Sequence, residues 1–269
     1  MDAYVVRLTA ILLLCTCWSS IAAQPPTKVT IYGDDAYPPY SYLEDGEAKG
    51  IYTEILQAVF KKMPDYRVTI ELVPWRRGLK LLATGDGFAL FPPYSYESNR
   101  QYISPYSIPI LNEEVVVYCQ PNSLKNRQSN NWPGDYFGLT VGINEAFSLG
   151  GKAFWQAVRQ GDILLKEGKS NRINILSLYK KRIDCYINDR LSILWEVNLL
   201  IDEGLIPPNW GLTFGTSISS EQGFLGFSNT ANDKYPYKER FVEQFNITLQ
   251  ELKQEGGVDK IISNFLQSN

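Results

Sequence analysis

Histidine is absent from the 269-residue chain. This absence excludes Ser-His-Asp triads, H-E-x-x-H metalloprotease sites and zinc sites with histidine ligands. Neither sign of charge dominates, because 26 Lys and Arg stand against 29 Asp and Glu. A nucleic-acid-binding protein normally carries a basic face, so the net charge of −3 argues against that class. The composition, 44% hydrophobic and 20% charged, predicts a globular protein of one or two domains.

Long apolar runs are also absent, and the short run near the N-terminus predicts an export signal. Arg7 precedes apolar residues 8–18, and small residues follow them. This order is typical of a secretory signal peptide, and the run is shorter than the ~20 residues that span a bilayer. We therefore expect residues 1–23 to be removed and the mature protein to be periplasmic. A lipid anchor on Cys15 or Cys17 is the alternative, although neither has the usual small residues before it.

Cysteine is scarce, and only Cys119 and Cys185 remain after the predicted signal. An oxidising compartment permits one disulfide between them. Their spacing leaves two buried thiols on strands as an equal alternative.

Apolar periodicity predicts two halves in which strands alternate with helices. This alternation is typical of an α/β fold in which each half is a mostly parallel sheet flanked by helices. The expected strands are 29–32, 67–73, 88–91, 139–143, 163–166 and 183–187. The expected helices begin or lie near 51–60, 79–84, 152–159, 172–181 and 191–201. Residues 34–42 are expected to form a loop rich in proline and tyrosine.

Two crossings between the halves predict a two-strand hinge. The β-branched run 113–120 is expected to cross from the first lobe to the second. Short strands at 212–215 and 223–227 would return to the first lobe, where the last two helices, 237–253 and 258–266, would follow. The predicted first lobe is thus discontinuous, 24–117 plus 216–269, and the second is 118–215. Ligands bind outside the carboxyl ends of strands in open α/β sheets, so we expect a ligand between the lobes and closure about the hinge.

Several motifs in the same order resemble one family. They are V-T-I-Y-G-D-D-A-Y-P-P-Y-S-Y at 29–42, G-I-Y-T-E at 50–54, the segment 97–106, L-T-V-G-I at 139–143, R-I-D-C-Y-I-N-D at 182–189, and the helix at 252–265. Their order and spacing resemble the periplasmic solute-binding proteins of amino-acid ABC transporters, solute-binding family 3. The resemblance implies the two-lobed periplasmic-binding-protein (Venus-flytrap) fold. In this topology the crossing strand lies antiparallel beside the strand that carries Cys185, which favours the disulfide with Cys119.

The resemblance also implies a ligand site. Arg100 matches the arginine that binds the ligand α-carboxylate, with Ser95 as a hydroxyl neighbour, and Asp189 matches the second-lobe acid that binds the α-ammonium. A planar guanidinium can pair a carboxylate bidentately, and a buried carboxylate complements an ammonium. Arg100 would otherwise bridge a surface carboxylate, and Asp189 would otherwise cap the helix that follows it.

Further ligand contacts are expected from loops around the cleft. Asp34, Tyr37 and Tyr40 match the first loop, which contacts the ligand side chain, although both tyrosines would also suit ordinary packing. Trp75 follows a strand end that faces the cleft. Phe147 or Ser148 would donate an N–H or hydroxyl near a helix start.

The chain also departs from the family pattern. Pro92-Pro93 removes two backbone donors where the family often has small polar residues. Tyr52 and Glu54 stand in place of an acidic pair, and residues 144–148 replace a loop rich in glycine and threonine. These departures leave the ligand class open.

The function expected from the sequence is capture of a small zwitterion, most simply an amino acid, for delivery to the membrane permease of an ABC transporter. We expect a monomer with no catalytic residue, cofactor or metal. One alternative is an enzyme similar to cyclohexadienyl dehydratase, with Glu145 or Glu54 as proton donor. Another is a module that presents its ligand to a membrane sensor. The charge clusters at 113–114 and 180–182 are expected to be solvated.

Overall fold

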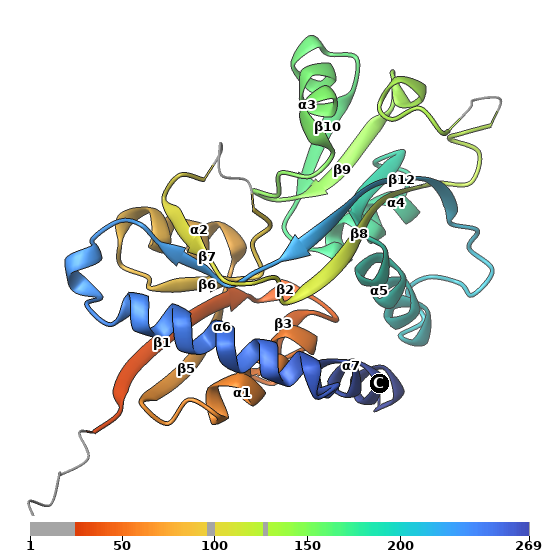
Figure 1. Cartoon of the computed structure of the whole chain (residues 1–269). Helices are drawn as coiled ribbons and strands as arrows, with labels where there is room; N and C mark the ends of the chain where they lie inside the picture. The colour runs from red at the N-terminus through yellow and green to blue at the C-terminus, as the bar shows by residue number, and fades with distance from the viewer. Residues whose placement is uncertain (1–24, 96–99, 126–128, 269) are drawn as a thin grey trace, which may run out of the picture.

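The computed structural model describes residues 25–95, 100–125 and 129–268, and the predicted signal peptide lies outside them. The chain forms two lobes (Figure 1), as expected, and each contains a five-stranded sheet. The sheet of the first lobe has the order β5-β1-β6-β13-β7 and that of the second has the order β10-β9-β11-β8-β12.

The first sheet is parallel at its centre. Here β1 pairs in parallel with β5 and β6, whereas β13 pairs antiparallel with β6 and β7. The strands are β1 (Thr27–Asp34), β5 (Tyr66–Val73), β6 (Ala89–Phe91), β7 (Ile103–Tyr106) and β13 (Gly226–Ser228). The helices of this lobe are α1 (Ile51–Lys61), α2 (Trp75–Thr84), α6 (Lys238–Gln254) and α7 (Gly257–Ser268).

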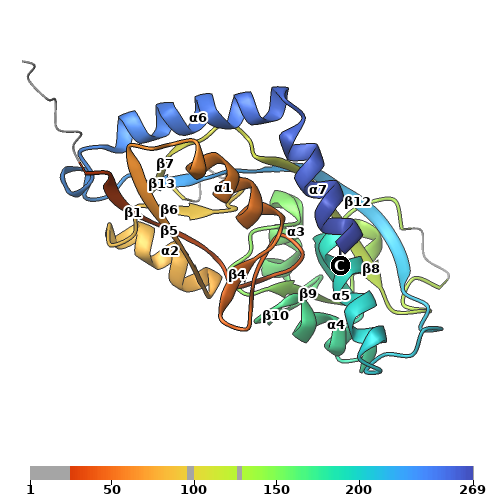
Figure 2. The same cartoon turned by 90° about the horizontal axis from the view of Figure 1, so that it is seen from below.

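Burial explains why α1 and α6 pack onto this sheet. Ile55 and Val59 recur on one face of α1, Phe241 and Phe245 on one face of α6, and all four are fully buried in one core with Ile31 of β1. A stripe with this spacing is what a helix needs in order to cover a sheet. Figure 2 shows α6 along one side of the first lobe and α7 reaching toward the second.

The second sheet is built mainly from the second half of the chain. Its strands are β8 (Leu111–Cys119), β9 (Thr140–Asn144), β10 (Leu164–Gly168), β11 (Cys185–Asp189) and β12 (Thr213–Gly223). Its helices are α3 (Gly151–Gln160), α4 (Asn171–Tyr179) and α5 (Arg190–Asp202). Short 3-10 turns occur at Gly134–Tyr136 and Asn232–Lys234.

Two segments differ from the prediction. The predicted loop at 34–42 contains β2 (Ala36–Tyr37) and the start of β3 (Ser41–Glu44), which pair antiparallel and join β4 (Glu47–Lys49). The residues expected as two short returning strands form the long strand β12 and then β13. The polar sequence of β12 has little alternation, and its extended form comes from pairing with β8 over its whole length.

The hinge strands both belong to the second sheet. The pairing of β8 with β12 extends to Leu111 and Gly223, so the predicted lobe boundaries at 117 and 216 fall inside these strands. Cys119 of β8 lies opposite Cys185 of β11, and their sulfur atoms are joined in a disulfide.

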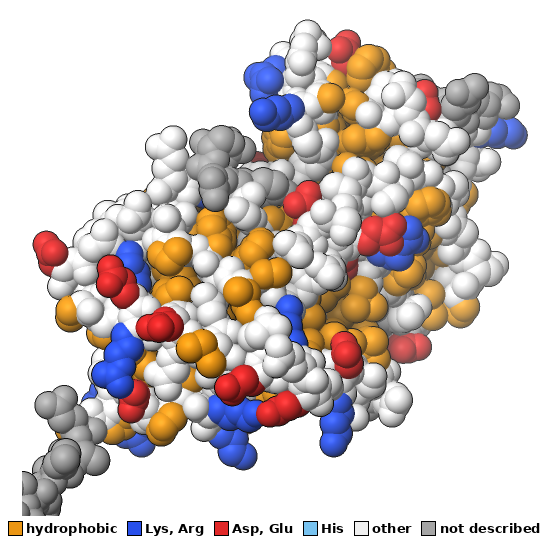
Figure 3. Space-filling model, viewed as in Figure 1, with side chains coloured by type: hydrophobic (Ala, Val, Ile, Leu, Met, Phe, Trp, Pro, Cys, Tyr) orange, Lys and Arg blue, Asp and Glu red, His pale blue; other side chains and the backbone are white. Residues whose placement is uncertain are grey.

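The surface carries mixed charge. On the face shown in Figure 3, acidic and basic side chains are interspersed. Among the helices that the structure describes, none is long and apolar enough to cross a bilayer.

Candidate ligand-binding site

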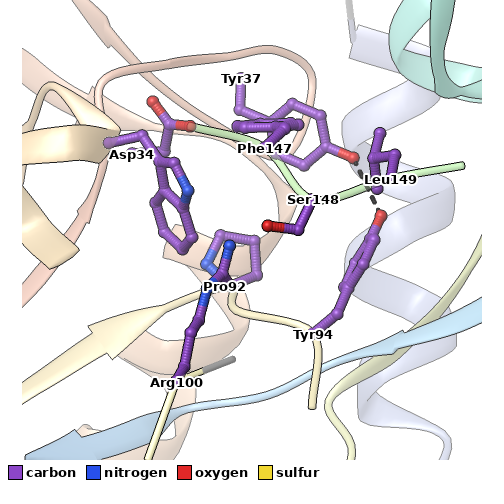
Figure 4. A pocket seen from close by; sticks show the side chains of 9 residues that line it. Asp34, Tyr37, Pro92, Tyr94, Arg100, Phe147, Ser148 and Leu149 are labelled. Atoms are coloured by element: carbon purple, nitrogen blue, oxygen red, sulfur yellow. Dashed lines mark hydrogen bonds between the residues drawn. The ribbon is translucent and has the colours of Figure 1, made fainter. Parts of the chain in front are cut away.

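A pocket lies between the lobes, beyond the carboxyl ends of β1 and β6 in the first lobe and of β9 in the second. This is where the topology predicts a ligand. Figure 4 shows side chains from both lobes converging on it. The lining residues are Asp34, Tyr37, Trp75, Pro92, Tyr94, Arg100, Phe147, Ser148 and Leu149.

The lobes are closed on each other around this pocket. The cavity between the lining side chains is only about 30 Å³, whereas sites for small molecules are typically at least ~300 Å³. The Phe147 ring, from the second lobe, lies 5.7 Å from the Tyr37 ring and 6.1 Å from the Trp75 ring, edge-on to both. A ligand of amino-acid size therefore requires this ring to move or the lobes to separate.

Polar contacts between the lobes accompany this closure. Ser192 Oγ donates a hydrogen bond of 2.6 Å to the carbonyl oxygen of Pro38. Arg76 and Glu145 form an ion pair of 3.0 Å between half-exposed side chains. Each contact joins one lobe to the other, so lobe opening must break both.

Arg100 provides the positive charge of the pocket. It is 5% exposed, and its guanidinium carbon lies 5.5 Å from the centroid of the Trp75 ring. A guanidinium is planar and weakly hydrated, so it can stack on an aromatic ring and still present donors to a carboxylate. In Figure 4, Arg100 points into the pocket and Ser148 directs its hydroxyl toward the centre.

Asp34 provides the negative charge. It is the last residue of β1, it is 4% exposed, and one of its oxygen atoms accepts a hydrogen bond of 3.0 Å from Ala36 N. Burial raises the pKa of Asp34 to about 7, and the nearby charge of Asp35 adds to this effect, while the Ala36 hydrogen bond opposes it. A cationic group placed beside this carboxylate would offset the cost of its ionisation.

Asp189 does not join Arg100 in the pocket. Because β11 runs directly into α5, the side chain at the strand end caps the helix, and Oδ1 accepts from Ser192 N at 2.9 Å. Its other oxygen accepts from Glu114 N at 3.0 Å, and Tyr40 also donates to this carboxylate. The capping alternative is therefore the one the structure shows, and Asp34 is the acid that shares the pocket with Arg100.

Two further predicted contacts lie outside the pocket lining. Ser95 is exposed. The Tyr40 ring is buried behind Tyr37, 5.1 Å from its ring and 5.6 Å from that of Tyr52. The structure thus brings together Arg100, Asp34, Tyr37, Trp75, Phe147 and Ser148 of the predicted set.

Two contributors to the site carry little signal in the sequence. Tyr94 lines the pocket, and its only signal was an aromatic residue next to the proline pair. Glu113, expected to be solvated, is 3% exposed because three tyrosines surround its carboxylate, so that expectation was wrong. Glu114 is half exposed and pairs with Arg190, and residues 180–182 are exposed as expected.

The two acids considered as proton donors do not line the pocket. Glu54 is exposed on α1, and Glu145 pairs with Arg76 at the rim. In the described part of the chain, no group of three or more acidic or cysteine side chains could hold a metal ion.

Two lobes joined by a two-strand hinge, with a pocket between them that contains buried side chains of both charge types, form the periplasmic-binding-protein fold. The chain belongs to the bacterial extracellular solute-binding proteins, family 3, whose sequence profile matches residues 29–268. No curated protein sequence matches the chain significantly.

Solved structures with the same fold are only distantly similar in sequence. A chain from a study of glutathione import through GshT and the cystine ABC importer TcyBC of Streptococcus mutans has a TM-score of 0.71 and 17% identity over 90% of this chain and 95% of its own. A histidine kinase sensor domain has a TM-score of 0.70 and 15% identity over 90% and 97%. An ancestral arginine-binding protein bound to arginine has a TM-score of 0.69 and 16% identity over 90% and 99%.

Proposed function

We propose that this protein captures a small zwitterion, most simply an amino acid or a close relative, between its lobes. The observation that carries the proposal is the presence of Arg100 and Asp34 in one pocket, two side chains of opposite charge type that are each more than nine-tenths buried. An ionised Asp34 is costly to bury, and Arg100 presents a planar set of donors to the same pocket, so the pocket suits a ligand that carries both an ammonium and a carboxylate.

The proposed orientation follows from the chemistry of each wall. The ligand carboxylate pairs with Arg100, where Ser148 also offers a hydroxyl. The cationic group faces Asp34, and the apolar part of the ligand lies against Tyr37 and Trp75. Phe147 moves aside as the ligand enters.

A thermal-shift screen with the 20 common amino acids, followed by calorimetric titration of the best one, tests this proposal. We expect at least one amino acid to raise the melting temperature and to bind with a stoichiometry of one. A protein stabilised by sugars or divalent metals, but by no amino acid, would contradict it.

Delivery to a membrane permease of an ABC transporter, from the periplasm, is the second part of the proposal. Support comes from the family and from the fold shared with a protein of glutathione import. Uptake of the labelled ligand into cells with and without the gene tests it. Normal uptake combined with loss of a transcriptional response to the ligand would instead favour the sensor function.

A further inference from the structure

A buried cluster of one carboxylate and three phenols lies directly behind the pocket. Glu113 Oε2 accepts hydrogen bonds from the hydroxyls of Tyr37 at 2.5 Å and Tyr94 at 2.6 Å. Glu113 Oε1 accepts from the hydroxyl of Tyr52 at 2.5 Å. Two of these tyrosines line the ligand pocket, so the carboxylate holds part of the pocket wall from behind.

The cluster also spans the hinge. Glu113 belongs to β8 of the second sheet, Tyr37 and Tyr52 pack in the core of the first lobe, and Tyr94, which follows β6, packs in the core of the second lobe. The other hinge strand, β12, leaves space for the cluster because it has a glycine at position 223. A Cβ atom on Gly223 would lie 1.8 Å from the Tyr52 hydroxyl oxygen and 2.9 Å from Glu113 Oε1. A backbone bridge joins Tyr94 to the same glycine.

The protonation state of Glu113 decides in which direction these hydrogen bonds run. An ionised carboxylate only accepts, and it can accept from all three phenols. A protonated carboxyl keeps acceptor capacity but gains one O–H donor, so the phenol that faces this O–H must accept from it and turn its own hydroxyl away. The phenols therefore have one arrangement with the ionised form and another with the neutral form.

Both forms are accessible near neutral pH. Burial and the nearby Asp189 raise the pKa of Glu113 to about 7, and the hydrogen bonds from Tyr37, Tyr52 and Tyr94 oppose this rise. These tyrosines come from β2, from α1 and from the segment after β6, and Asp189 comes from the end of β11. Tyr40 reaches Asp189 from the first lobe.

We propose that Glu113 is a positioning residue whose proton occupancy sets where Tyr37 and Tyr94 stand in the ligand pocket, so that ligand affinity falls as the pH falls. The link to affinity depends on the proposed function. The movement of the two tyrosines does not, and it is measurable without any ligand.

Nuclear magnetic resonance of protein labelled with ¹³C at the tyrosine Cζ atoms tests the movement. The resonances of Tyr37 and Tyr94, assigned through single Tyr→Phe variants, are expected to titrate with a common midpoint in the wild-type protein. Glu113→Gln should abolish this titration, and Glu114→Gln, which changes the half-exposed neighbour, should preserve it.

Two further variants keep Glu113 in place and so do not depend on the folding of Glu113→Gln. Tyr52→Phe removes a hydrogen bond that stabilises the ionised carboxylate, so the midpoint should move to higher pH. Asp34→Asn removes the acid that lines the pocket and should leave the midpoint in place. The inference is overturned if the two resonances do not titrate between pH 5.5 and 8.5, or if Asp34→Asn abolishes their titration.

Calorimetric titration with L-arginine as the probe tests the link to affinity. If binding requires ionised Glu113, the affinity of the wild-type protein should rise between pH 5.5 and 8.5. Given a pKa of about 7, this rise should exceed that of Glu113→Gln by up to about 30-fold. An equal gain in both proteins overturns the link. If L-arginine does not bind the wild-type protein at either pH, the affinity link fails for this ligand, and the resonance titration still decides the movement.

Discussion

Two buried carboxylates near the hinge, Asp34 and Glu113, differ in what surrounds them. Each is less than 5% exposed, and burial raises the pKa of each to about 7. Three phenols donate to Glu113. Among the described residues, the hydrogen bond to the Asp34 side chain comes from Ala36 N.

This difference supports the proposal that Glu113 is a structural acid and Asp34 a ligand-binding acid. The protein supplies Glu113 with its own donors, and the carboxylate is sealed behind the pocket wall. Asp34 is buried at nearly the same cost, yet it retains accepting capacity on the pocket side. A buried acid with few internal hydrogen-bond donors can accept further hydrogen bonds from a ligand.

The largest effect on affinity is expected from Arg100→Ala. Removal of the guanidinium leaves the ligand carboxylate desolvated beside neutral donors, with a loss of about 2–5 kcal/mol in binding free energy. Calorimetric titration with the amino acid selected by the thermal-shift screen measures it.

Asp35→Ala is the matched control for that measurement, since Asp35 adjoins Asp34 but is not among the described lining residues. A surface substitution of this kind should change the binding free energy by less than about 0.5 kcal/mol. If the affinities of Arg100→Ala and wild type are equal, the ligand carboxylate is held elsewhere.

Asp34→Asn should change how the unfolding free energy depends on pH. Because the folded-state pKa of Asp34 is raised from 3.8 to about 7, its contribution to stability is present below pH 3.8 and is lost as the pH rises through 7. The asparagine variant should therefore match wild type near pH 4 and exceed it in unfolding free energy at pH 8, by up to about 4 kcal/mol. Urea unfolding at both pH values measures this, and parallel pH profiles for the two proteins would refute it.

Reduction of the Cys119–Cys185 disulfide should affect stability and leave the pocket intact. The bond closes a sequence separation of 66 residues at the end of β8 opposite to Glu113, and loss of such a bond typically costs about 2–4 kcal/mol. Unfolding with and without reductant measures the cost. Two alkylatable thiols in the non-reduced tryptic digest would show that the bond is absent.

Gly223→Ala should disturb the cluster around Glu113 from the other hinge strand. The added methyl group overlaps the Tyr52 hydroxyl, so we expect a loss of about 1–3 kcal/mol in unfolding free energy. Tyr52→Phe in the same chain removes the overlapping oxygen and should recover part of the loss. Gly211→Ala, where the nearest atom is 3.8 Å away on Pro121, is the control and should be neutral.

Local sequence patterns predicted the fold well. The apolar periodicity of 51–60 and the β-branched run at 115–117 located α1 and β8, because burial alone explains both. The pairing of β12 was harder to predict, since its polar sequence adopts a strand only through its neighbour β8.

The site was predictable in part. Trp75 was placed near a cleft by the strand that ends before it, and Arg100 and Phe147 by the resemblance to solute-binding family 3. The burial of Glu113 did not, because its partners lie 19 to 76 residues away in sequence and meet only when the lobes assemble. The sequence left open whether Asp189 binds the ligand or caps the next helix, and the hydrogen bond from Ser192 N in the folded chain shows the cap.

The central claim, a ligand carboxylate held by Arg100, is tested most directly with the amino acid that gives the largest thermal shift and with its carboxamide. Both ligands are titrated into wild type and into Arg100→Ala. The account predicts that wild type binds the amino acid far more tightly than the amide, and that Arg100→Ala discriminates little between them. Equal discrimination by the two proteins would contradict it.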